Sequence, residues 1–215
     1  MWDESTLQML LQGVGETLYM TLGSTLFAYI IGLPLGVLLV MWAADGIRPH
    51  PVLYKILDVT RSFPFIILLI AVLPFTRWLL GTTLGPTAVI VPLTISAAPF
   101  VARLVEGSLK EVDVGVIEAS QSMGASALQI IWKVLLPEAR PSLILNCAIA
   151  ITTILGYTAM AGFVGGGGLG DIAIRFGYYR REEDIMLVTV VLLIVVVQVF
   201  QGLGLWIARR LDRRK

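Results

Sequence analysis

The sequence predicts an all-α membrane protein with five transmembrane helices, and two observations lead to this fold class. Hydrophobic residues make up 57% of the 215 residues and charged residues only 14%, whereas a soluble domain carries about 25% charge. The charged residues also occur in clusters, which leaves four charge-free stretches longer than the roughly 20 residues of helix that cross a bilayer. Lipid is therefore the main solvent of this chain.

The five predicted spans follow one another along the chain. Four of them lie within the charge-free stretches, at about 17–44, 82–102, 141–165 and 185–208. The other, second along the chain at about 60–80, contains Arg61 and Arg77. Trp78 and the two leucines after it continue the apolar character past Arg77, whose long side chain can reach the lipid headgroups. We therefore expect a span here as well.

The basic residues predict the orientation of these spans. An odd number of spans places the two termini on opposite sides of the membrane. With the N-terminus outside, twelve basic residues lie in cytoplasmic segments and four lie outside, which agrees with the positive-inside rule. The four outside are Arg77, Arg175, Arg180 and Arg181. We predict an N-out, C-in arrangement.

Prolines and glycines inside the predicted spans indicate kinked and closely packed helices. A proline in a membrane helix is tolerated where neighbouring protein or a water-lined cavity satisfies the freed backbone groups. Pro34, Pro64 and Pro92 therefore suggest helices arranged around a path. Gly32 and Gly36 have the small-xxx-small spacing that allows two helices to approach closely.

The segment 111–140, between the third and fourth spans, has the pattern of two short helices joined by a turn. Asp113 lies near the start of the first helix, where its charge complements the helix dipole. Gly124 can adopt the left-handed conformation that ends a helix. Ser126 and Gln129 have the spacing of a capping box for a second helix, which Pro137 would end or kink. The segment therefore predicts a rigid projection that enters a groove on another protein.

The same segment resembles the EAA loop of ABC importer permeases. Glu118-Ala119-Ser120 is followed by three residues, Gly124, nine residues and Val134-Leu135-Leu136-Pro137. The family pattern is Glu-Ala-Ala, three residues, Gly, nine residues and Ile-x-Leu-Pro, so Ser120 and Val134 are mild departures. In that family the loop is the coupling helix that docks into the ATP-hydrolysing subunit. The resemblance implies ATPase coupling by Glu118, Ala119, Ser120, Gly124, Ala125, Leu136 and Pro137.

Further segments look like those of methionine importer permeases in particular: Arg61–Leu69, Pro74–Arg77, Ala97–Arg103 and Gly156–Gly162. The glycine-rich stretch 165–170 also fits, although osmoprotectant permeases share much of it. This resemblance implies a single transmembrane domain over residues 1–215 that moves methionine, in both D and L forms, across the bacterial inner membrane by alternating access. A permease for another small amino acid or an osmoprotectant is the alternative.

The resemblance also implies partners. They are a second copy of this chain, two copies of an ABC ATPase and an external methionine-binding lipoprotein, besides the small-molecule substrate and membrane lipid. The formal net charge of +1 lacks the basic excess of a nucleic-acid-binding surface, so we expect no nucleic acid. The sequence has no G-x-x-x-x-G-K-[ST] phosphate loop. We therefore expect a non-catalytic chain without cofactor or metal, with ATP and magnesium bound by the partner ATPase.

Tyr157 and Met160 in the fourth span are the predicted gate of the translocation path. They lie three residues apart and so share one face of a helix. Gly156 and Gly162 beside them would allow the same segment of a second copy to approach. A methionine can pack a closed constriction and then repack, and the tyrosine hydroxyl could replace lost water contacts. Ordinary packing between helices is the alternative.

Other classes of function have weaker support. Gly165, Gly167 and Gly170 match the dinucleotide fingerprint, but a genuine one follows a strand, so a flexible turn at the outer mouth fits better. Ser108 could suggest an intramembrane serine protease, although we expect it to cap the next helix. His50, the lone histidine, is expected to be a solvated loop residue. A passive channel or a structural anchor stays open, but hydroxyl side chains in the spans favour a path over an anchor: Thr94, Ser96, Thr152, Thr153 and Thr158.

Overall fold

The computed structural model describes residues 3–44 and 51–211 of the chain. Every regular element within these residues is helical, as the sequence predicts. In chain order the elements are α1 (Glu4–Ala44), α2 (Pro51–Ser62), α3 (Phe65–Leu80), α4 (Pro86–Lys110), α5 (Val114–Ser122), α6 (Ala127–Ile130), the π-helix η1 (Ile131–Leu135), α7 (Leu136–Glu138), α8 (Arg140–Ala161), the 3-10 turn η2 (Gly162–Val164), α9 (Gly168–Ile172), the π-helix η3 (Ala173–Tyr179) and α10 (Glu183–Leu211).

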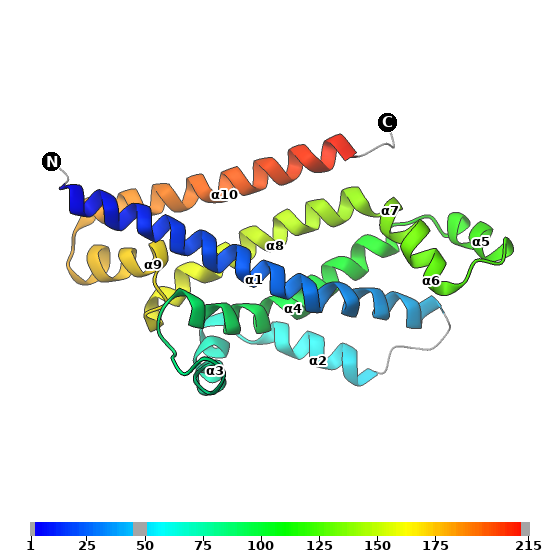
Figure 1. Cartoon of the computed structure of the whole chain (residues 1–215), viewed down its shortest axis with the longest axis horizontal. Helices are drawn as coiled ribbons and strands as arrows, with labels where there is room; N and C mark the ends of the chain where they lie inside the picture. Colours follow the sequence, from blue (N-terminus) through cyan, green and yellow to red (C-terminus); the bar gives the residue numbers. More distant parts are fainter. Residues whose placement is uncertain (1–2, 45–50, 212–215) are drawn as a thin grey trace.

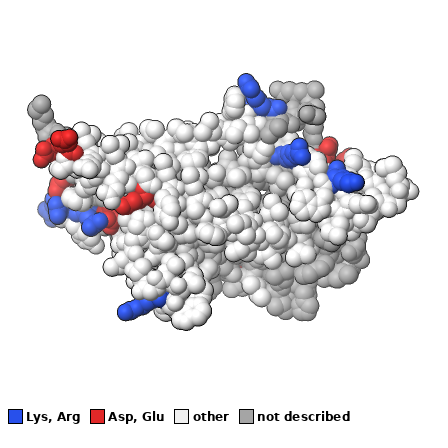
Figure 2. Space-filling model, in the orientation of Figure 1, with Lys and Arg blue, Asp and Glu red and all other residues white. Residues whose placement is uncertain are grey.

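Four of these helices, α1, α4, α8 and α10, are long and apolar enough to cross a membrane. They confirm four of the five predicted spans. They run roughly along the long axis of the molecule, and the start of α1 and the end of α10 lie at opposite ends (Figure 1). On the face seen in Figure 2, charged side chains gather toward the two ends and leave a broad band between them almost free of charge. This is the surface of a multi-pass membrane protein.

The segment predicted as the second span differs most from expectation. The structure divides it into α2 and α3, which are separated by Phe63 and Pro64. A proline restricts the residue before it to extended conformations, and Pro64 itself has φ −56° and ψ 129°. The helix axis changes direction there: α2 lies roughly along the long axis, whereas α3 is seen nearly end-on (Figure 1). With 16 residues α3 is shorter than the four spans, so a crossing by this segment stays a prediction.

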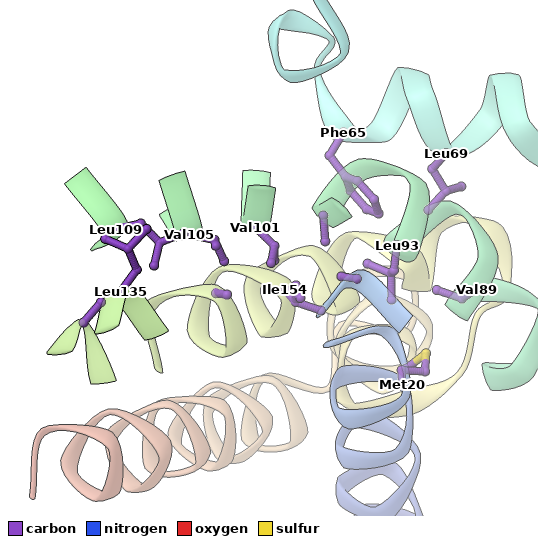
Figure 3. Packing of buried hydrophobic residues seen from close by; sticks show 14 of the residues in the cluster. Met20, Phe65, Leu69, Val89, Leu93, Val101, Val105, Leu109, Leu135 and Ile154 are labelled. Atoms are coloured by element: carbon purple, nitrogen blue, oxygen red, sulfur yellow. The ribbon is translucent and has the colours of Figure 1, made fainter. Parts of the chain in front are cut away.

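The hydrophobic core is built around α4. In the most apolar 18-residue stretch of α4, 67% of the residues are buried inside the chain. In the equivalent stretch of α10, only 11% of the residues are buried. Val101, Val105 and Leu109 form a row along α4, with Leu135 beside Leu109 and Ile154 of α8 in the same cluster (Figure 3). α4 is therefore the central helix, while much of α10 faces outward.

Close contact between α1 and α4 confirms the packing expected at Gly32 and Gly36. A Cβ atom added to Gly32 would lie 2.8 Å from the carbonyl oxygen of Ala98, and one added to Gly36 would lie 2.6 Å from that of Ala102. Both separations are too short for a real side chain, because the obstacle is the backbone of α4. Two turns of α1 thus rest directly on the α4 backbone.

The glycine-rich turn after α8 is packed against α1. The side chain of Glu16 accepts a hydrogen bond from the backbone N–H of Gly168 (2.7 Å), and the hydroxyl of Thr17 accepts one from that of Leu169 (2.9 Å). These N–H groups belong to the first turn of α9 and have no partner within the helix. Positive φ angles of 71°, 79° and 77° explain the glycines at Gly165, Gly167 and Gly168. The predicted turn is present, but it is a packed part of the fold rather than an open loop.

We predict that Gly36→Ala destabilises the protein, because the added methyl group would push α1 away from α4. Overpacking of this kind costs about 1–3 kcal/mol. Gly15→Ala is the matched control: it lies in the same helix, a Cβ there meets nothing within 4 Å, and alanine is the better helix former by up to about 1 kcal/mol. Thermal unfolding in detergent should show a lower Tm for Gly36→Ala and an equal or higher Tm for Gly15→Ala. Equal Tm values in both variants would contradict the close contact.

Candidate functional site

The first half of the candidate coupling loop folds as the sequence predicts. The side chain of Asp113 caps α5 by accepting a hydrogen bond from the N–H of Gly115 (2.7 Å). After α5, Gly124 has a φ of 79°, the left-handed conformation that ends helices. The N–H of Ala125 then donates to the carbonyl of Ser120 (3.1 Å), which closes the turn.

The second half of the loop begins with the predicted capping box. The hydroxyl of Ser126 accepts from the N–H of Gln129 (3.4 Å), and the side chain of Gln129 accepts from the N–H of Ser126 (2.9 Å). The helix that follows is not one regular α-helix, however. Through η1 the backbone is wound as a π-helix, in which the N–H of Leu136 donates to the carbonyl of Ile131. Pro137 follows directly and has no N–H to continue the α-helical pattern, so the predicted second helix is present in three pieces.

The structure places five of the seven predicted coupling residues on α5 and the turn after it and the other two, Leu136 and Pro137, on α7, and it exposes them to different degrees. α5 lies beyond the end of the long helices, and α6 lies at the level of the end of α1 (Figure 1). Glu118, Ala119 and Gly124 are exposed, whereas Ala125, Leu136 and Pro137 are partly buried. Ser120 is buried and its hydroxyl donates to the carbonyl of Val116 (2.8 Å), so its side chain serves the loop itself. Ser120, Gly124 and Ala125 line one shallow hollow together with Met123, Gln129, Lys133 and Val134.

Large apolar side chains on the loop were missed from the sequence. Met123 is 80% exposed, Leu128 62% and Trp132 68%. Exposed apolar clusters on a segment outside the apolar band mark interaction sites. The signal that could have identified them is the absence of charge from Ala119 to Trp132. The prediction of a docking surface used only the small residues of this stretch and not its large apolar ones.

The two predicted gate residues of α8 have different surroundings. The ring of Tyr157 stacks on that of Phe65 of α3, with centroids 4.5 Å apart and planes 7° apart. Met160 is 44% exposed on the surface of the chain. A Cβ on Gly156 would meet nothing within 4 Å, and Gly156 lines an apolar hollow with Leu193 and Ile194 of α10 in its own chain, so approach of a second copy there stays a prediction. The same expectation for Gly162 is wrong, because Gly162 is packed against the backbone of the glycine-rich turn in its own chain.

A buried carboxylate in α4 was also missed. Glu106 is 4% exposed and accepts hydrogen bonds from Arg103 (2.7 Å) and Lys110 (2.6 Å), one turn to either side. Arg103 also pairs with Asp58 of α2 at 3.1 Å. A buried charge is tolerated only when it is paired and hydrogen-bonded. The network compensates Glu106 and ties α2 to the central helix, which only the fold reveals because Asp58 is distant in sequence.

Ser108 does not have the surroundings of a nucleophile. Its hydroxyl oxygen is buried between α4 and α8, where it accepts from the side-chain amide of Asn146 (2.7 Å) and the hydroxyl of Ser142 (3.1 Å). No histidine, lysine or carboxylate takes part in these contacts. The expectation that Ser108 caps the next helix is wrong, because α4 continues to Lys110.

The glycine motif at 165–170 follows helices α8 and η2 rather than a strand, and His50 lies outside the described residues.

Comparisons with known proteins agree with this architecture. The chain is 47% identical over 217 residues to the probable D-methionine transport system permease protein MetI of Vibrio cholerae serotype O1, covering 99% of this chain and 96% of that protein. It is 49% identical over 164 residues to the D-methionine transport system permease protein MetI of Escherichia coli (strain K12), covering 74% and 76%. A chain of the solved inward-facing MetNI methionine ABC transporter matches with a TM-score of 0.96 and 44% identity over 99% of this chain and 100% of that one.

A broader family description applies to most of the chain. Residues 32–215 match the family described as binding-protein-dependent transport system inner membrane component. The match includes the candidate coupling loop and all of α3 to α10. This chain belongs to that family of inner-membrane transport components.

Proposed function

We propose that this chain is the permease subunit of an ATP-driven ABC importer that moves methionine across the inner membrane. The observation that carries the proposal is the agreement over 99% of the chain with a subunit of a methionine ABC transporter, at 44% identity. Residues 1–215 form one transmembrane domain in this proposal. The five spans run N-out and C-in, with α3 completing the second crossing, so that the coupling loop lies in the cytoplasm.

ATP hydrolysis belongs to a separate subunit in this scheme, which binds ATP and magnesium, because the sequence has no phosphate loop. The coupling loop docks in a groove of that ATPase. Its exposed Met123, Leu128 and Trp132 supply the apolar contact area, while the hydrogen-bonded turn at Gly124 keeps the projection rigid. A rigid projection converts movement of the ATPase into rotation of the helices, which opens the path first to one side and then to the other.

The complete importer contains two copies of this chain, two ATPase subunits and an external methionine-binding lipoprotein. Exposed apolar residues on α8 and α10 support pairing with a second copy and contact with lipid, since little of α10 is buried within one chain. Tyr157 and Met160 form the gate on the path between the two copies. The spans carry few charged groups at mid-depth, so tight recognition of the substrate's ammonium and carboxylate belongs to the external protein.

Uptake of radiolabelled methionine tests the substrate assignment. The permease, its ATPase and its binding protein, expressed together in a strain that lacks its own methionine importer, should restore uptake of both the D and the L form. Omission of any one component is the control and should abolish uptake. Absence of methionine uptake, together with uptake of a labelled osmoprotectant or another small amino acid that requires all three components, would replace the substrate with that compound.

Substitution of Gly124 tests the coupling role. The φ of 79° is costly for a leucine by about 1–2 kcal/mol, and although a Cβ there meets nothing within the chain, a leucine would fill the space that the ATPase occupies. Gly124→Leu should lower ATPase stimulation by ligand-loaded binding protein in proteoliposomes by about tenfold, or about 1.4 kcal/mol. Gly124→Asn is the control, since asparagine tolerates this conformation. Full stimulation of an assembled Gly124→Leu complex would exclude the coupling role.

Truncation of Met160 tests the gate. Met160→Ala should raise basal ATPase activity or substrate leak by about threefold, which corresponds to weakening the closed state by about 0.7 kcal/mol. Ile149→Ala is the matched control, because Ile149 lies on the same helix and is 42% exposed compared with 44% for Met160. If both variants behave alike in leak, coupling and uptake, Met160 is a packing residue and not part of a gate.

A further inference from the structure

A hollow of about 390 Å³ lies where the ends of α4 and α10 meet the start of α8. Its walls combine charged, hydroxyl and apolar side chains, among them Ser108, Glu111, Glu138, Ser142, Leu205 and Arg209. It is separate from the coupling loop's hollow and from the gate residues, and no step of the proposed transport cycle uses it. Its volume suits a small polar group rather than a single water molecule.

The charged groups of this hollow are exposed and are arranged differently from the buried carboxylate of α4. Glu106, one turn before the end of α4, is compensated by two cations in direct contact. Among the described residues, in contrast, none of Glu111, Glu138 and Arg209 is in a salt bridge, although all three line the same space. Two carboxylates and one guanidinium held apart around a hollow match a ligand that carries both an ammonium and an anionic group.

The depth of the hollow points to a lipid as the source of this ligand. Arg209 lies in the last turn of α10, beside Trp206, whose half-exposed ring is covered by the guanidinium of Arg210 at 4.4 Å. Tryptophan and arginine together at the end of a membrane helix mark the level of the lipid headgroups. On the membrane side the hollow is walled by Leu145 of α8 and Leu205 of α10, which offer an apolar surface to an acyl chain.

We propose that this hollow binds the headgroup of a phospholipid with a primary ammonium, a phosphatidylethanolamine. Arg209 contacts the phosphate, the ammonium lies between Glu111 and Glu138, and an acyl chain follows Leu145 and Leu205. The N–H groups of a primary ammonium can donate to both carboxylates. The quaternary ammonium of phosphatidylcholine has no N–H to donate, and phosphatidylglycerol has no cation. The site therefore discriminates between headgroups and does not depend on which end of the chain faces the cytoplasm.

Native mass spectrometry of the full-length permease in detergent tests this site. Phosphatidylethanolamine, phosphatidylcholine and phosphatidylglycerol with identical acyl chains are added separately, and the bound fraction is measured. Wild type should prefer phosphatidylethanolamine over phosphatidylcholine by about tenfold, the effect of one to two charge-assisted hydrogen bonds. The Glu111→Gln/Glu138→Gln double variant should lose most of this preference, whereas Arg209→Gln should weaken binding of all three lipids.

Matched controls separate the site from general effects of charge. Glu118→Gln removes an exposed carboxylate of the coupling loop, and Arg210→Gln removes the neighbouring arginine that stacks on Trp206; both should keep the wild-type preference. An unchanged Tm in detergent shows that each variant is folded. Three results would overturn the proposal: no headgroup preference in wild type, an undiminished preference in the folded double variant, or displacement of the lipid by free methionine or glycerophosphoethanolamine at millimolar concentration. Displacement would assign the hollow to a soluble zwitterion.

Discussion

The contact between α1 and α4 is the constraint on which the rest of the fold depends. Gly32 and Gly36 bring the two backbones together without intervening side chains, and such close packing replaces the hydrophobic driving force that is missing between helices in lipid. Once α1 lies against α4, its N-terminal part reaches the turn after α8, where Glu16 and Thr17 satisfy the first N–H groups of α9. One helix thus positions both the central helix and the turn at the far end of the bundle.

Many polar groups buried by this packing are compensated inside the chain, because lipid offers them no hydrogen bonds, although the hydroxyls of Ser24 and Thr94 have no partner among the described residues. The hydroxyl groups of Thr17, Thr21 and Thr25 each donate to a carbonyl one turn earlier in α1. Asn146 and Ser108 join α8 to α4 by a hydrogen bond of 2.7 Å. Hydroxyl side chains in the spans are therefore weak evidence for a translocation path, although they favoured one in the sequence. A threonine hydroxyl can donate its hydrogen bond to a carbonyl of its own helix.

Features set by local backbone chemistry were predictable from the sequence, and features set by contacts between distant segments were not. Four spans, the left-handed Gly124 and the capping box of Ser126 follow from runs of apolar residues or from spacings of a few residues, and all are present. The π winding of the helix before Pro137 was not predicted, and the expectation for Gly162 was wrong, since each depends on how neighbouring segments meet. Pro64 indicated from the sequence that the second span is interrupted, but the change in helix direction between α2 and α3 could not be predicted.

Exposed apolar residues have different meanings at different depths of this molecule. On α10 an exposed side chain such as Val195 lies within the apolar band, where lipid solvates it at no cost. Met123 and Trp132 lie on a projection beyond that band, where water solvates them and each Å² of apolar area left exposed costs about 25 cal/mol. The turn at Gly124 that presents them is closed by the hydrogen bond from the N–H of Ala125 to the carbonyl of Ser120. A partner surface that covered these side chains would recover this free energy, which is the physical ground for the coupling role proposed for the loop.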